Sequence, residues 1–151
     1  MYQKILVPLD GSELAECTLS HAKMMIKEGF AREATLLNIV RIDLPWAELY
    51  GTNFNRDAVR EAYFASARKY LADVESRLGA EGIKVKTEVL EADRTGVAIT
   101  DYARDKGMDA IVIATHGYTG LKRLMLGSVA MSVLHDSSVP VILIRPEACR
   151  V

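Results

Sequence analysis

One stretch, residues 114–128, contains several glycines and several residues with hydroxyl side chains. It reads A-T-H-G-Y-T-G-L-K-R-L-M-L-G-S. Glycine allows backbone N–H groups to come close to a ligand. A helix N-terminus adds unpaired N–H donors and the positive end of the helix dipole. A loop of this kind between a strand and a helix can therefore bind a phosphate group. Glycines also occur in loops for turn geometry alone, so their number by itself does not establish the site.

The segments on either side of this stretch have the patterns that such a site requires. Ile111-Val112-Ile113 is a β-branched run, which indicates a buried strand. Residues 129–135 carry apolar side chains at helical spacing, and Ser128 stands where a helix cap is expected. The local prediction is strand, glycine loop, helix.

The full spacing narrows the interpretation. Gly117, nine intervening residues and then Gly127-Ser128 resemble the nucleotide-binding motif of the universal stress protein family, G-x-x-G-x9-G-[S/T]. The V-P-V-I-L-I segment after the helix fits the same family, and the resemblance covers essentially the whole chain. Ala114 replaces the first motif glycine. Extended backbone tolerates the methyl group, so binding depends on whether this methyl group leaves enough space for the ligand. We expect nucleotide binding to be retained.

Strand and helix patterns alternate along the 151 residues, which predicts a single α/β domain, 1–151. Alternation requires crossover connections, hence a parallel sheet with helices on both faces. The resemblance implies an open five-stranded sheet in the order 3-2-1-4-5, a Rossmann-like fold of the adenine nucleotide alpha hydrolase-like type. The predicted strands are 4–10, 34–42, 83–90, 109–114 and 139–145.

Two further segments carry structural predictions. Residues 56–81 form a long helical pattern with an apolar stripe of Val59, Tyr63, Tyr70, Val74 and Leu78, which we expect to face the core. Residues 43–55 contain aromatic side chains without a clear period and are predicted to be a long loop.

Open α/β sheets bind ligands where the carboxyl ends of central strands meet. From position alone, Asp10 is best interpreted as a cap for the first helix. The resemblance implies instead that its carboxylate lies at the nucleoside, and that the backbone of Ile39 meets adenine. The predicted site residues are Pro8, Leu9, Asp10, Ile39, Ile113, Ala114, Gly117, Gly127, Ser128, Val129 and Ala130.

The resemblance also implies the ligand and the assembly. The ligand would be ATP or AMP, with Mg²⁺ or Mn²⁺ held through the phosphates and no metal site in the protein itself. The assembly would be a regulatory homodimer joined through the last strand, Val139 to Arg145. This segment is strongly apolar, and an exposed apolar edge strand tends to pair with another strand unless a helix or the tail covers it.

Other function classes fit less well. The net charge of −1 does not indicate a surface for nucleic acid or an anionic membrane. No apolar run reaches the roughly 18–20 residues of a membrane helix, and no signal-peptide pattern opens the chain, so we expect a cytoplasmic protein.

An enzyme is the least favoured class. The sequence has neither a P-loop nor a G-x-G-x-x-G motif, and no residues are predicted to be catalytic. Any ATP hydrolysis is expected to be slow and incidental. The alternative to a nucleotide-responsive protein is an interaction dimer of the same fold that works without nucleotide.

Overall fold

The computed structural model describes residues 1–43, 55–115 and 126–145. It confirms the predicted alternation of strand and helix and the sheet order β3-β2-β1-β4-β5, with every neighbouring pair parallel. Most of the predicted loop 43–55, and Gly117, lie outside the described residues. The elements are β1 (Tyr2–Pro8), α1 (Glu13–Lys27), β2 (Ala31–Val40), α3 (Arg56–Ala80), β3 (Val85–Glu91), α4 (Thr95–Asp105), β4 (Ala110–Ala114), α5 (Ser128–Asp136) and β5 (Val141–Ile144).

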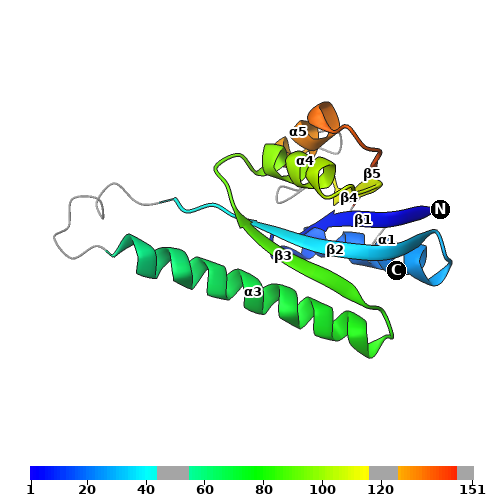
Figure 1. Ribbon diagram of the computed structural model, residues 1–151, viewed down its shortest axis with the longest axis horizontal. Helices are drawn as coiled ribbons and strands as arrows, with labels where there is room; N and C mark the ends of the chain where they lie inside the picture. Colours follow the sequence, from blue (N-terminus) through cyan, green and yellow to red (C-terminus); the bar gives the residue numbers. More distant parts are fainter. Residues whose placement is uncertain (44–54, 116–125, 146–151) are drawn as a thin grey trace.

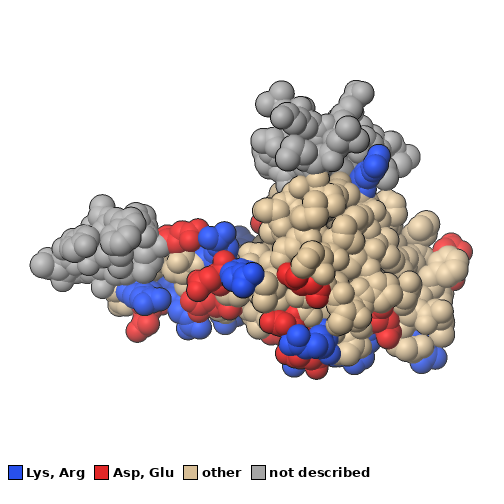
Figure 2. All heavy atoms as spheres, turned by 90° about the horizontal axis from the view of Figure 1, so that it is seen from above, with Lys and Arg blue, Asp and Glu red and all other residues tan. Residues whose placement is uncertain are grey.

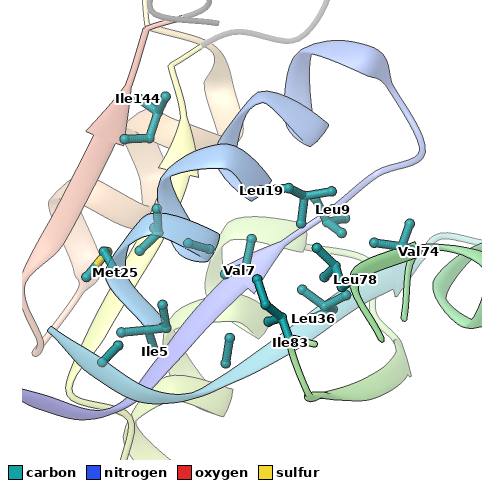
Figure 3. Close-up of a cluster of buried hydrophobic side chains, with 14 of the residues drawn as sticks. Ile5, Val7, Leu9, Leu19, Met25, Leu36, Val74, Leu78, Ile83 and Ile144 are labelled. Atoms are coloured by element: carbon teal, nitrogen blue, oxygen red, sulfur yellow. The ribbon is translucent and has the colours of Figure 1, made fainter. Parts of the chain in front are cut away.

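Helices cover both faces of the sheet, α1 and α3 on one and α4 and α5 on the other (Figure 1). Alternate residues of β1 enter the two cores, as the period of a strand requires. Ile5 and Val7 pack against α1 and α3 in the cluster drawn in Figure 3, whereas Leu6 packs against α4 and α5. All three side chains are fully buried, so β1 is the centre of the fold.

A hydrogen bond network joins the two helices of the first face. Glu16 on α1 accepts hydrogen bonds from Tyr70 and Arg77 of α3, each at 3.0 Å. Burial, followed by the hydrogen bond to Glu16, raises the pKa of the Tyr70 hydroxyl. The hydroxyl therefore remains protonated and keeps donating at physiological pH.

The apolar stripe predicted for residues 56–81 is wrong at Tyr63, whereas Val59 is half-buried. Tyr63 is 44% exposed, and the first buried residue of α3 is Ala67. The reason is length, because α3 spans 25 residues and its N-terminal part projects beyond the sheet (Figure 1). Figure 2 shows charged side chains gathered over this projecting part. The helix therefore has a core-facing side only where the sheet lies beneath it.

The two edges of the sheet differ in character. On β3, residues 86–88 are exposed, and Lys86 forms an ion pair with Glu33 at 2.8 Å. On β5 the side chains are all aliphatic and half-buried or buried. β5 begins later than predicted because Pro140, which cannot donate a ladder hydrogen bond, precedes it.

Asp109 joins the central strands β1 and β4 at their N-terminal ends. Its carboxylate accepts hydrogen bonds from the backbone N–H of Lys4 at 2.8 Å and of Gln3 at 2.6 Å. These two bonds hold the pKa of Asp109 below its ordinary value. A carboxylate with a lowered folded-state pKa stabilises the fold above its unfolded pKa, about 3.9, and this stabilisation is lost as the pH falls through the folded-state pKa.

We therefore predict that Asp109→Asn lowers the melting temperature at pH 7 by about 2–4 °C. The difference from the wild type should shrink as the pH is lowered below 4, where the wild-type carboxyl becomes neutral. Melting curves at a series of pH values test this, with Asp73→Asn on the exposed side of α3 as the control. A loss of stability that does not change with pH would contradict the assignment.

Candidate functional site

A cavity of about 350 Å³ opens at the carboxyl ends of the central strands. This volume is in the range of sites for small organic ligands. All of the predicted site residues except Gly117, which lies outside the described residues, line the cavity. Those residues are Pro8, Leu9, Asp10, Ile39, Ile113, Ala114, Gly127, Ser128, Val129 and Ala130.

Five further residues line the cavity that were not predicted from the sequence: Ala15, Leu37, Thr95, Ile99 and Thr115. Thr95 and Ile99 lie one turn apart on α4 and bring a third element to the cavity. No local pattern marks them, because their role depends on how α4 packs on the sheet face beside α5. The position of Thr115, directly after β4, was the available signal, since the residues that follow a central strand face the crevice.

Pro8 is the reason that β1 and β4 separate at this point. The two strands pair only at Ile5 with Ala110 and at Leu6 with Ile111. From Lys4 onward the backbone groups of alternate β1 residues face the same neighbour, and the Asp109 N–H to Lys4 O bond of 2.8 Å shows that the even-numbered residues of this part face β4. The next donor toward β4 would be residue 8, and proline has no N–H. The β1–β4 ladder therefore stops, and the cavity begins.

Asp10 takes part in capping α1 and also lines the cavity. Its Oδ1 accepts a hydrogen bond from the backbone N–H of Ser12 at 2.9 Å and another from the Ser12 hydroxyl. The Ser12 hydroxyl in turn accepts from the Ala15 N–H at 3.1 Å, as an N-cap does. The capping residue is thus Ser12, and Asp10 holds it in place. This fixes the Asp10 carboxylate at the rim of the cavity.

The N-terminus of α5 is held against the end of β4. The Gly127 N–H donates to the carbonyl of Thr115 at 2.8 Å, and the Gly127 carbonyl accepts the first helical bond, from Met131, at 2.9 Å. Gly127 is therefore the cap and Ser128 the first helical residue, which corrects the prediction that Ser128 is the cap. Among the residues that the structure describes, no side chain caps α5. The N–H groups of the first turn are left without intrahelical acceptors, and the residues that carry them line the cavity.

The backbone at the two motif positions does not require glycine. Gly127 has φ −61° and ψ 155°, which any residue adopts. Ala114 is the last residue of β4, and no non-glycine residue in the described part of the chain has a positive φ. What glycine provides at residue 127 is therefore space in the cavity wall and not an unusual backbone conformation. At residue 114, alanine adds a methyl group without straining the backbone.

Gly96 allows α4 and α5 to approach each other closely. A Cβ atom on Gly96 would lie 2.4 Å from the Ser132 Oγ and 2.5 Å from the Ser132 Cβ. Rotation of the serine side chain could move the hydroxyl but not its Cβ, so the helices themselves would have to separate. The close contact therefore fixes the first turn of α5 relative to Thr95 at the cavity.

A second hollow, of about 180 Å³, lies beside the first and shares residues of the α4 and α5 N-termini with it. Arg41, Arg94 and Asp93 line this hollow, and all three are exposed. Arg41 also forms an ion pair with Asp43 at 3.6 Å. The two guanidinium groups bring positive charge to the outer side of the α5 N-terminus, and the Asp93 carboxylate offsets part of it. Within the described residues, no three His, Cys, Asp or Glu side chains are grouped so that they could hold a metal ion. None of the helices there is long and apolar enough to span a membrane.

Comparison with known proteins places this geometry in a family. The model of the universal stress protein family matches residues 1–145. The universal stress protein MJ0531 of Methanocaldococcus jannaschii is 31% identical over 145 residues, which cover 96% of this chain and 83% of that protein.

Solved structures agree with the same assignment. The structure of MJ0577, a universal stress protein of the same organism, is 30% identical and superposes with a TM-score of 0.76 over 96% of each chain. A universal stress protein family member from Arabidopsis thaliana, solved with AMP bound, is 16% identical, with a TM-score of 0.64 over 95% of this chain and 91% of that one. At that identity the likeness shows the fold alone.

The contact at Gly96 gives a prediction. Gly96→Ala should destabilise the protein by about 1–3 kcal/mol, the usual cost of inserting a methyl group where there is no space. Denaturant unfolding measures the loss. Ser132→Gly removes the opposing atoms at a cost of about 0.5–1 kcal/mol for a glycine within a helix.

The double variant should therefore be more stable than Gly96→Ala alone, although it contains a second unfavourable change. Additive losses in this double-mutant cycle would show that the two positions are not in contact.

Proposed function

This chain belongs to the universal stress protein family, and from that premise we propose that it binds ATP or AMP in the cavity between β1 and β4 and acts as a nucleotide-responsive regulatory dimer in the stress response. The observation that carries the proposal is the junction at Gly127. There a helix N-terminus, with no side-chain cap from the described residues, lies against the end of a central strand, beside a cavity of mononucleotide size.

Different residues of the cavity lining suit the base, the ribose and the phosphates of a nucleotide. Leu37, Ile39 and Ile99 provide an apolar environment for a flat base. Asp10 has a carboxylate at the rim that can accept hydrogen bonds from ribose hydroxyls, since only its Oδ1 bonds to Ser12. The N–H groups of Ser128 and Val129 would donate to phosphate oxygens, with the helix dipole adding to the attraction.

Charge at the second hollow favours a ligand with more than one phosphate. Arg41 and Arg94 lie on the outer side of the α5 N-terminus, where a phosphate chain would extend. A Mg²⁺ or Mn²⁺ ion would be held through the phosphates. ATP is therefore the preferred ligand in this proposal, and AMP would use the same base and ribose contacts.

The regulatory assembly would be a homodimer through β5. This is the apolar edge of the sheet, whereas the exposed residues of β3 on the opposite edge include charged side chains. Pairing of two β5 strands would bury an edge that otherwise favours uncontrolled association. The same dimer without nucleotide is the alternative function, favoured by the methyl group of Ala114 at the cavity wall.

Gly127→Val tests the phosphate contact. The backbone conformation at residue 127 accepts valine, so the fold should be retained. The branched side chain would stand where the phosphate approaches and would remove one or two hydrogen bonds to a charged group, each about 1.5–3 kcal/mol. We expect the affinity for ATP, measured by the anisotropy of a fluorescent ATP analogue, to fall about 10- to 100-fold or more.

Gly79→Val is the matched control, because Gly79 lies on α3 away from the cavity and a Cβ there would meet nothing within 4 Å. The control should bind as the wild type does. Unchanged affinity in folded Gly127→Val would remove this loop from the site.

Ile142→Lys tests the dimer. A lysine at the centre of paired β5 strands would bring an unpaired charge to an apolar interface, which costs several kcal/mol. Sedimentation should show a monomer, or a dimer dissociation constant raised at least about tenfold. Thr87→Lys on the other edge should leave the dimer intact. A folded Ile142→Lys protein that remains dimeric would exclude this interface.

A further inference from the structure

The ladder between β1 and β2 ends in an unusual way beside the cavity. Its last pair is Pro8 with Leu37, and the Leu9 N–H then donates to the Leu37 carbonyl at 2.9 Å. In a regular parallel ladder the next bond would run from the Ile39 N–H to the Leu9 carbonyl. That bond is absent among the backbone hydrogen bonds of the described residues.

A side chain takes its place. The Nδ2 of Asn38 donates to the Leu9 carbonyl at 2.9 Å. Asn38 is buried on β2, and a buried amide without a partner would be costly, so this bond is strongly favoured. The carbonyl of Leu9 is therefore satisfied by a side chain at the point where the backbone of the neighbouring strand would otherwise satisfy it.

The consequence falls on Ile39. Along β2, the backbone groups of alternate residues face the same neighbour. The Leu37 carbonyl faces β1, where it accepts from Leu9, and the Val40 carbonyl faces β3, where it accepts from Ala92 at 3.1 Å. By this alternation the N–H and C=O of Ile39 face the β1 side, beyond the end of β1. Ile39 lines the cavity there.

We propose that Asn38 is a positioning residue for base recognition, which takes the Leu9 carbonyl and so leaves the Ile39 N–H and C=O free for the edge of the base. This role rests on the proposed nucleotide site. It explains why the Ile39 N–H and C=O are available to a ligand there. Adenine presents an acceptor, N1, beside a donor, the 6-amino group, which complements these two backbone groups. Without the Asn38 amide, the ladder closes by one bond and the donor is consumed.

The first test needs no ligand. In Asn38→Leu, which has the same branching and no donor, the Ile39 N–H should bond to Leu9, and its hydrogen exchange should slow at least about tenfold. A merely structural role predicts the reverse, because loss of a buried hydrogen bond lowers stability and speeds exchange. Asn38→Ala, which also lacks the donor, is the second variant in case leucine prevents folding.

Thr35→Val is the matched control for this exchange experiment. Thr35 is a buried polar residue on the same strand, away from the cavity. Its replacement should not slow exchange at Ile39. If Ile39 is already as protected in the wild type as the neighbouring ladder amides, or if neither Asn38 variant slows it, the inference is wrong.

The second test asks whether Asn38 is needed for recognition of one ligand atom, N1 of adenine. The wild type should bind ATP about three- to tenfold more tightly than 1-deaza-ATP, which lacks the N1 acceptor, as one hydrogen bond predicts. In Asn38→Leu this preference should disappear while binding through the phosphates persists. A preference that survives in the variant would overturn the inference. Failure of the wild type to bind either ligand would contradict the proposed function and leave the exchange experiment to decide how the ladder ends.

Discussion

The site depends on how strand β1 ends. This strand is the centre of the sheet, with neighbours on both sides, and its middle residues are fully buried. On the β4 side, Pro8 has no N–H to continue the ladder. On the β2 side, the side chain of Asn38 takes the carbonyl that the ladder would use. The β4 side thereby opens into a cavity, and on the β2 side the Ile39 N–H does not bond to the Leu9 carbonyl in the described part of the chain.

The remaining elements are arranged to hold this opening in shape. Asp10 and Ser12 fix the start of α1 on one side of the cavity. The bond from Gly127 to Thr115 fixes the start of α5 on the other side. The absence of a side chain at Gly96 lets α4 lie close enough to complete the wall. Each contact is local, but together they bring residues from both halves of the chain to one place.

Much of this could be predicted from the sequence, for identifiable reasons. Apolar runs such as Ile111-Val112-Ile113 are buried on both faces, and therefore indicate central strands of a parallel sheet. The order of the strands came from the family resemblance, because periodicity carries no information on which strands are neighbours. The site residues that follow β1 and β4 were predictable because they lie next to recognisable motifs. Thr95 and Ile99 were not, because only the packing of α4 against α5 brings them to the cavity. Tyr63 was misplaced because a helical stripe does not show where the sheet beneath it ends.

The most direct test of the proposed function is calorimetric titration of ATP with Mg²⁺ into the purified protein, after mass spectrometry has shown whether nucleotide was carried through purification. We predict saturable binding with a dissociation constant in the micromolar range or below, about −8 kcal/mol or more favourable. Absence of binding by protein that carries no nucleotide would contradict the claim that the cavity between β1 and β4 is a nucleotide site, and would indicate that the methyl group of Ala114 closes it.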